Sequence, residues 1–379
     1  MRILLVGEYS RLHNSLKEGL IALGHDVTII GNGDSFKKYP VDIFISHSFK
    51  NWFLKKLKAG VHKLFGINLS ALEVYYKSKK AINTLPDFDV VQLINELAFK
   101  TNSKYEIKLL ENVLLKTKKL YLLSCGVDYY SVKFMMEGGF RYSIMTPYLN
   151  KTGNEKDYKF KLGQLSTNHK KLQEFIYKNC NGIIASDMDY HLPLQGWDKY
   201  LGLIPNAINT DKINFITPLI NNKIRIFHGV NKAMQHKKGN AYFFEALDVI
   251  QKKYSDKVDI ITTYSLPYDE YIKIYDSCHI LLDQIYGYDQ GYNALEAMSK
   301  GKVVFTGAEE EWLTYYKLEK DTIAINTLPD VNYLVEKLEW LILNPEKIIE
   351  ISKNARTFIE EHHNYKTVAK MYLNTWQTN

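Results

Sequence analysis

The sequence contains little cysteine, and its three cysteines are far apart. Cys125, Cys180 and Cys278 are odd in number and lack the close spacing of a metal site. They predict neither a disulfide framework nor a zinc site, and they fit a reducing compartment. The roughly 18 consecutive apolar residues of a transmembrane helix are also missing. The first ten residues, MRILLVGEYS, are too briefly apolar for a secretory signal, so we expect a cytoplasmic protein.

The glycine-rich fingerprint of dinucleotide-binding enzymes is absent as well. Residues 7–11 (GEYSR) follow the first expected strand with a single glycine. Residues 31–36 (GNGDSF) follow the second strand and lack the third glycine of Gly-x-Gly-x-x-Gly. Because that fingerprint lets the backbone approach a pyrophosphate closely, its absence argues against a nicotinamide-dependent dehydrogenase.

Acidic residues are scarce in one segment, and this scarcity accounts for the net charge of +7. Residues 50–80 hold a single acid, Glu73, against eight lysines, at positions 50, 55, 56, 58, 63, 77, 79 and 80. The remainder of the chain is close to neutral. Since the basic run is local and no RNA- or DNA-binding motif accompanies it, we expect no nucleic-acid partner.

What the sequence does contain is a repeated alternation of short apolar strands and amphipathic helices. Its 379 residues are enough for two domains. The pattern restarts near residue 223, and it predicts parallel α/β structure in both halves. Strands are expected at residues 3–6, 27–30, 41–46, 90–94, 120–124 and 182–185, then at 223–227, 258–262, 280–283, 302–306 and 323–325.

The most informative stretch is GYNALEAMSKGKVVFTG, residues 291–307. Gly291 opens a helix whose free N–H groups and positive dipole end favour an anion. Tyr292 and Asn293 belong to its first turn. Glu296, one turn further on, repels phosphate but accepts hydrogen bonds from vicinal hydroxyls such as those of a ribose. Together these features predict a nucleoside-diphosphate site, although an ordinary strand–helix unit has the same glycine turn.

A second candidate stretch is HGVNKAMQHKKG, residues 228–239, which follows the first strand of the second half. Its lysines, Lys232 and Lys238, are suited to neutralise a departing diphosphate. The alternative is a solvated lysine-rich loop. Asp283 ends a later strand, and ligands of open α/β sheets bind at such carboxyl ends, so we expect it to face the site.

These motifs resemble glycosyltransferase family 4, a family of retaining sugar transferases with the GT-B fold. Glu296-Ala297-Met298 with Gly301 matches the second half of its Glu-x7-Glu motif, and Lys238-Gly239 matches its Lys-Gly. The first Glu falls at Tyr288, so Asp289 is the candidate replacement. Residues 204–211 (IPNAINTD) resemble the family's Ile-Pro-Asn-Gly-Val-Asp linker, with Ala207 in place of glycine.

The resemblance implies GT-B architecture: two Rossmann-like α/β domains with a cleft between them. It places an acceptor-binding domain at residues 1–205, a nucleotide-sugar domain at 206–360, and a helix crossing back onto the first domain at 361–379. It implies catalytic roles for Lys232, Lys238, Asp289 and Asp128, donor binding by Gly291, Tyr292, Asn293, Glu296, Tyr288, Gly229 and Asp283, and acceptor-side roles for Gly7, Glu8, Tyr9, Asn95 and Glu96.

The implied activity is retaining transfer of a hexose or N-acetylhexosamine from a nucleotide sugar, with a UDP-sugar favoured. The acceptor would be a glycan or lipid-linked molecule in cell-surface polysaccharide or capsule synthesis. No cofactor and no metal are expected, since basic side chains and a helix end neutralise the leaving group. A nucleotide-sugar 2-epimerase of the same fold and a non-catalytic nucleotide-sugar-binding protein remain alternatives.

Residues 49–65 carry a separate hypothesis. Phe49, Phe53, Leu57, Val61 and Leu64 fall on one helical stripe with lysines beside it. A basic amphipathic helix with Trp and Phe suits an anionic membrane surface, so the protein is expected to be cytoplasmic with a possible peripheral association. The alternative is a helix whose stripe packs on its own domain.

Overall fold

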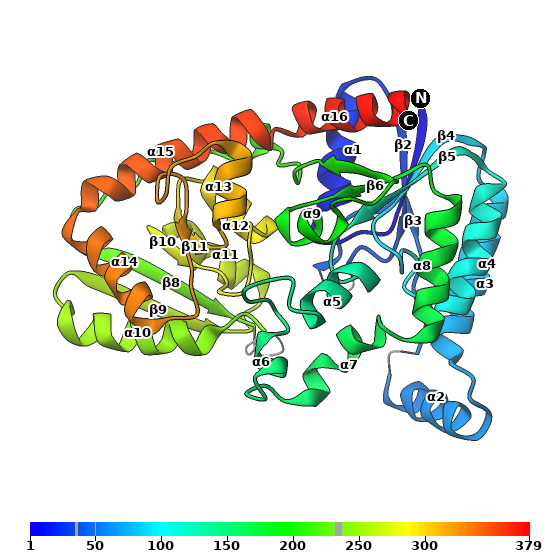
Figure 1. Cartoon of the computed structure of the whole chain (residues 1–379), viewed down its shortest axis with the longest axis horizontal. Helices are drawn as coiled ribbons and strands as arrows, with labels where there is room; N and C mark the ends of the chain where they lie inside the picture. The colour runs from blue at the N-terminus through cyan, green and yellow to red at the C-terminus, as the bar shows by residue number, and fades with distance from the viewer. Residues whose placement is uncertain (35–36, 50, 232–236) are drawn as a thin grey trace. The chain divides into compact units, whose positions relative to one another are not determined.

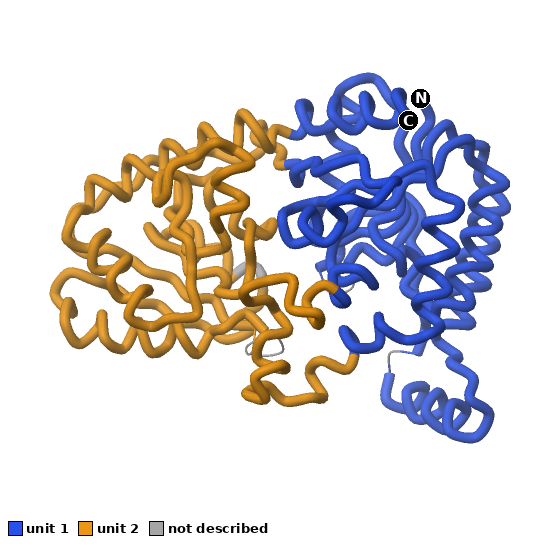
Figure 2. The backbone as a smooth tube through the Cα atoms, viewed as in Figure 1, with its two compact units in different colours: residues 1–133, 160–207, 365–379 blue, residues 134–159, 208–364 orange. Residues whose placement is uncertain are grey.

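The computed structural model describes residues 1–34, 37–49, 51–231 and 237–379 (Figure 1). They form two compact units (Figure 2). Unit 1 comprises residues 1–133, 160–207 and 365–379, and unit 2 comprises residues 134–159 and 208–364. Each unit is built on its own parallel sheet, as the two runs of alternating strands and helices predicted.

Unit 1 contains a seven-stranded parallel sheet in the order β3-β2-β1-β4-β5-β6-β7. Its inner strands are short apolar runs that are buried on both faces, which is the usual condition of a parallel sheet. The expected strand at 41–46 contracts to two residues, and a last strand appears that the sequence did not predict. The strands are β1 (Arg2–Val6), β2 (Asp26–Gly31), β3 (Ile43–Phe44), β4 (Phe88–Leu93), β5 (Thr117–Ser124), β6 (Gly182–Ala185) and β7 (Tyr200–Leu203).

Helices cover this sheet, and several begin at a polar cap. The side chains of Asn68, Asn102 and Ser166 accept hydrogen bonds from the first turns of α3, α4 and α8. The helices are α1 (Leu12–Ala22), α2 (Trp52–Phe65), α3 (Leu69–Thr84), α4 (Ser103–Leu114), α8 (Thr167–Asn179), α9 (Met188–Leu194) and α16 (Tyr365–Thr378), with α5 (Tyr129–Met136) and α7 (Glu155–Gly163) at the borders with unit 2.

Helices α1 and α16 pack against each other although the chain places them far apart. The contact passes through Gly19 of α1. A Cβ atom at this position would lie 2.2 Å from the carbonyl oxygen of Tyr365 and 2.8 Å from the Cβ atom of Ala369. Only glycine lets the two helices approach this closely, so Gly19 fixes where α16 docks on unit 1.

Unit 2 contains a five-stranded parallel sheet in the order β12-β11-β10-β8-β9. The strands are β8 (Ile224–Val230), β9 (Val258–Tyr264), β10 (Ile280–Leu282), β11 (Val303–Thr306) and β12 (Ile325–Asn326). The helices are α6 (Thr146–Leu149), α10 (Asn240–Lys253), α11 (Tyr268–Ser277), α12 (Tyr292–Ser299), α13 (Glu310–Tyr316), α14 (Val331–Leu343) and α15 (Pro345–His362), with the 3-10 turn η2 (Thr210–Lys212).

Residues 134–159 belong to unit 2, whereas the sequence analysis placed them in an N-terminal domain of residues 1–205. Their anchor is Arg141, whose guanidinium donates hydrogen bonds of 2.6 Å to Glu309 and 2.7 Å to Glu311. Tyr142 also donates its hydroxyl to Glu309. These contacts join residues distant in sequence, and no local pattern reveals them.

No helix in the described ranges is both long enough and apolar enough to cross a membrane.

Candidate functional site

Three predicted site residues meet at the carboxyl edge of the unit 2 sheet. Asp283 follows β10, Lys238 precedes α10, and Asn293 lies in the first turn of α12. The Lys238 ammonium lies 2.9 Å from Asp283 Oδ1, and the Asn293 side-chain N–H donates to the same oxygen at 3.0 Å. Because the Asp283 side chain is nearly inaccessible to water, this carboxylate fixes the positions of both donors.

Two tyrosines of α11 hold Asn293 from behind. The Tyr271 hydroxyl donates to Asn293 Oδ1 at 3.3 Å, and the Tyr275 hydroxyl donates to its backbone carbonyl at 2.9 Å. Burial raises the pKa of both hydroxyls, which therefore stay protonated as donors. Gly229 makes room for this arrangement, since a Cβ atom there would lie 2.6 Å from the Tyr271 ring.

Two helices begin at this edge without a side-chain cap from their N-cap residue. Helix α12 starts after Gly291, and α10 starts after Gly239, which adopts the left-handed conformation with φ 71°. A Cβ atom on Gly239 would lie 2.7 Å from the side chain of Ile285, so glycine is required there for packing as well. The first N–H groups of these helices are suited to an anion beside Lys238.

Glu296 lies one turn into α12 and remains partly accessible, with 26% of its side chain exposed. The Lys300 ammonium lies 3.5 Å from its Oε1, at the usual i,i+4 spacing. A carboxylate in this position still has acceptor capacity for hydroxyl groups.

The two residues at the first half of the motif are both buried. Tyr288 accepts a hydrogen bond of 2.7 Å from the backbone N–H of Arg141, and the Arg141 guanidinium lies 4.8 Å from the centre of its ring. Asp289 Oδ1 accepts the N–H of Gln290 at 2.5 Å. Where the resemblance implies a carboxylate, the chain therefore uses Tyr288 to hold residues 134–159 on unit 2.

His228, at the end of β8, is a buried neighbour of the site that the sequence analysis did not single out. Burial lowers its pKa to about 4, so the ring is neutral near pH 7. Its Nε2 lies 2.8 Å from Asn240 Oδ1 in the first turn of α10, and a neutral ring donates this hydrogen bond from Nε2. The pair joins β8 to the start of α10 and so positions the Lys238–Gly239 turn.

Glu8 is the most strongly perturbed predicted residue of unit 1. It follows β1 and is fully buried, and its Oε2 accepts hydrogen bonds from the backbone N–H of Asn14 at 2.9 Å and from its side chain at 2.5 Å. Its Oε1 has no hydrogen-bond partner in the described part of the chain. Burial raises the pKa of Glu8 to about 7, with a smaller contribution from the charge of Asp34.

The other acceptor-side residues lie at the ends of β1 and β4. Gly7 has φ 86°, and a Cβ atom there would lie 2.3 Å from the Ile94 side chain. The Lys100 ammonium lies 4.1 Å from the centre of the Tyr9 ring, and burial raises the pKa of Tyr9 to about 12. Asn95 uses its Oδ1 to accept the N–H of Leu97 at 2.9 Å.

Glu96 and Asp128 are both committed to buried local structure. His169 of α8 lies 2.6 Å from Glu96 Oε2, which also accepts the N–H of Tyr129 at 3.1 Å. Burial raises the pKa of Glu96 despite these donors. Asp128 accepts the N–H of Ser131 at 2.7 Å and the hydroxyl of Ser124. The sequence analysis missed His169, because a lone histidine on a helix carries no local signal.

Lys232, the remaining predicted catalytic residue, lies outside the described residues. Within the described part of the chain, no group of three or more His, Cys, Asp or Glu side chains is arranged to hold a metal ion.

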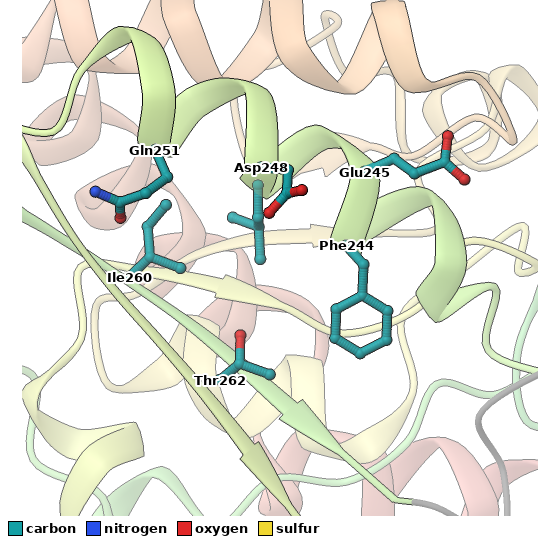
Figure 3. A pocket seen from close by; sticks show the side chains of 7 residues that line it. Phe244, Glu245, Asp248, Gln251, Ile260 and Thr262 are labelled. Atoms are coloured by element: carbon teal, nitrogen blue, oxygen red, sulfur yellow. The ribbon is translucent and has the colours of Figure 1, made fainter.

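A separate pocket in unit 2 lies between α10 and β9 (Figure 3). Phe244, Asp248 and Gln251 of the helix line it together with Ile260 and Thr262 of the strand. It contains no predicted site residue, and its lining lacks a basic group for a phosphate. The cluster of Lys238, Asp283 and Asn293 therefore remains the candidate site of this unit.

Residues 230–374 match a family model described as glycosyl transferase-like. The matched range includes Lys238, Asp283, Asn293 and Glu296. No curated relative matches the chain. The model covers less than half of the sequence, and it supports a glycosyltransferase.

Solved structures resemble the whole chain. Sucrose-phosphate synthase from Thermosynechococcus elongatus is 12% identical with a TM-score of 0.63, covering 100% of this chain and 99% of its own. Anabaena HepE, in a complex with UDP and glucose, is 12% identical with a TM-score of 0.58 and full coverage of both chains. S. aureus TarM, in a complex with fondaparinux, alpha-GlcNAc-glycerol and UDP, is 15% identical with a TM-score of 0.54, covering 82% of this chain and 59% of TarM. At this identity the likeness concerns the fold, and it confirms the predicted GT-B class with two Rossmann-like α/β domains.

Proposed function

We propose that the protein is a cytoplasmic, retaining, metal-independent glycosyltransferase. It transfers a hexose or N-acetylhexosamine from a nucleotide sugar, with a UDP-sugar favoured, to a glycan or lipid-linked acceptor in cell-surface polysaccharide synthesis. The observation that carries the proposal is the meeting of Lys238, Asp283 and Asn293 beside the uncapped start of α12. The glycosyl transferase-like family match and the UDP bound to HepE and TarM support it.

The chemistry assigns each residue a task. Lys238 and the N–H groups of α12 stabilise the negative charge that grows on the departing diphosphate. Asp283 holds Lys238 and Asn293 in place before the donor arrives, so little reorganisation is needed during the reaction. Glu296 accepts hydrogen bonds from the ribose hydroxyls. In front-face transfer the leaving phosphate itself helps to take the acceptor proton, so a strong protein base is not required.

Two variants test these roles through nucleotide binding. Lys238→Met removes one charge-assisted bond to phosphate, worth about 1.5–3 kcal/mol. Because Lys238 also gives up part of its pairing with Asp283, we expect the lower limit, roughly a tenfold loss of UDP affinity. Lys273→Met, at an exposed position of α11, is the matched control and should bind UDP normally.

Pyrophosphate, used as a competitor of UDP, separates the two roles. Lys238→Met should weaken both ligands, whereas Glu296→Ala should weaken UDP and leave pyrophosphate unchanged. The measurement is isothermal titration calorimetry with UDP, GDP and ADP, with and without EDTA. Equal affinity for UDP in Lys238→Met and the unaltered protein would remove the main support for the proposal, and loss of binding in EDTA would contradict metal independence.

Product analysis separates transfer from the alternatives. Incubation with UDP-sugars alone should give no epimer, and addition of a glycan acceptor should release UDP with retention at the anomeric carbon. Conversion of the donor to its 2-epimer without an acceptor would identify an epimerase instead.

A further inference from the structure

Helix α2 of unit 1 leaves a stripe of large apolar side chains in water. Every residue of α2 is exposed or half-buried, and Figure 1 shows the helix outside the layered body of the unit, next to α3. Phe53 is 69% exposed, Leu57 47% and Leu64 76%. At about 100° per residue these three positions share roughly 40° of the helix circumference. The stripe is therefore continuous, and burial in its own domain does not explain it.

The opposite side of α2 accounts for its few internal contacts. Leu54 lines an apolar groove with Leu69 and Leu72 of α3, so this part of the helix is already in use. The exposed stripe is additional to that contact and makes no equivalent contribution to the fold. Its exposure is the structural difference between the two explanations offered by the sequence, a packed stripe and a membrane-binding stripe.

The stripe is surrounded by positive charge. Helix α2 carries Lys55, Lys56, Lys58 and Lys63 and has no acidic residue. Glu73 is the single acid between residues 50 and 80, and it is engaged by Lys77 at 2.7 Å. The positive charge of α2 is therefore not neutralised by a carboxylate from this stretch of the chain.

At the start of the helix, an aromatic ring and a lysine form a single unit. The Lys56 ammonium lies 3.9 Å from the centre of the Trp52 ring, and Trp52 is itself 69% exposed. Trp and Lys side chains of this kind are enriched at the boundary between acyl chains and headgroups, where the ring has an apolar contact and the ammonium reaches phosphate.

We propose that α2 docks unit 1 onto an anionic lipid bilayer. Phe53, Leu57 and Leu64 enter the boundary between headgroups and acyl chains, and the lysines of α2 contact lipid phosphates. A nucleic acid would neutralise the lysines but leave the apolar stripe in water. A second copy of α2 would cover the stripe but bring lysines against lysines. A bilayer with anionic headgroups satisfies both features at once.

Vesicle flotation with the full-length chain tests this surface without any nucleotide. Vesicles of phosphatidylcholine with phosphatidylglycerol should carry the protein to the top of the gradient, and phosphatidylcholine alone should not. The charge variant replaces Lys55, Lys56, Lys58 and Lys63 by Gln. Since each lysine near an anionic surface contributes about fivefold to partitioning, its binding should fall by at least a hundredfold.

The stripe variant, Phe53→Gln with Leu57→Gln and Leu64→Gln, keeps the charge and removes only the apolar contact. Glutamine has a good helix propensity, and all three positions are exposed, so the fold should be retained by circular dichroism. Its binding should also fall by at least tenfold. The matched control changes four exposed lysines of unit 2 to Gln and should bind as the unaltered protein does: Lys252, Lys257, Lys320 and Lys353.

Four results would overturn the proposal. The unaltered protein would stay at the bottom of the gradient with anionic vesicles. The stripe variant would float as well as the unaltered protein, which would show that no apolar side chain enters the bilayer. The unit 2 control would lose as much binding as the charge variant. Light scattering would find a dimer that the stripe variant converts to a monomer while no vesicle binding occurs. Each result leaves the nucleotide site of unit 2 untouched, so this proposal and the proposed function fail independently.

Discussion

Replacing Glu8 by glutamine should stabilise unit 1 at alkaline pH, and the size of the effect follows from the burial of this side chain. Its pKa is raised from the usual 4.5 to about 7. The native state therefore keeps a proton that the unfolded chain loses. The corresponding stability is fully present below pH 4.5 and is lost as the pH rises through 7. At about 1.4 kcal/mol per pH unit, the loss amounts to about 3 kcal/mol.

Glutamine is a close substitute because it keeps the interactions that Glu8 makes. Its carbonyl oxygen can take the place of Oε2 and accept both hydrogen bonds from Asn14. Its amide then lies at Oε1, which has no partner in the described residues, and it carries no charge at any pH. The free energy of unfolding of Glu8→Gln should therefore rise relative to the unaltered protein by about 3 kcal/mol between pH 4.5 and pH 8.

The assay is pulse proteolysis in urea at both pH values, with the fragments of unit 1 identified by mass spectrometry. This readout follows one unit, which matters because a chain with two units need not unfold in a single step. Glu111→Gln, at an exposed position of α4, is the control, since that side chain meets water in both states. If the difference between Glu8→Gln and the unaltered protein is the same at both pH values, Glu8 is not held neutral by burial and the reasoning is wrong.

Further predictions concern close contacts within each unit. Gly19→Ala should lower the free energy of unfolding of unit 1 by about 1–3 kcal/mol in urea titrations, because the new methyl meets the backbone oxygen of Tyr365 and this outweighs the gain in helix propensity. Gly60→Ala, where a methyl meets open space in α2, should instead stabilise that helix by up to about 1 kcal/mol; destabilisation by both changes would contradict the argument. Tyr288→Phe should leave the N–H of Arg141 without its partner, cost unit 2 about 1–3 kcal/mol, and speed limited proteolysis within residues 134–159; an unchanged cleavage rate would show that this bond does not hold the segment.

Much of the fold could be predicted from the sequence because the central strands are short runs of apolar residues. β1, β4 and β5 are buried on both faces, so each gives a clear local signal. β7 was missed because three of its four residues are only half-buried and Gly202 interrupts its apolar pattern. β3 contracted to Ile43–Phe44, where the edge of the sheet provides a partner on one side only.

The site was predictable to the extent that it depends on strand ends and helix starts. Lys238, Asp283 and Asn293 each stand next to such a boundary, and parallel topology brings these boundaries to one edge of the sheet. The supporting residues were not predictable, since their roles depend on contacts across the sequence. Tyr271 contacts Asn293 from another helix, and Arg141 reaches Tyr288 from a segment that precedes unit 2 in the chain.

The docking of α16 on α1 has a consequence for how the protein is made. Gly19 is synthesised early, but the backbone of Tyr365 that it contacts is added roughly 350 residues later. At about 5–20 residues per second, α1 waits on the order of 20–70 s for its partner. Leu16 and Leu20 of α1 are buried in the finished unit and lie in the same core as Val368 of α16. During that interval the nascent chain lacks the cover that α16 later supplies, so unit 1 reaches its final packing only after the ribosome has completed unit 2.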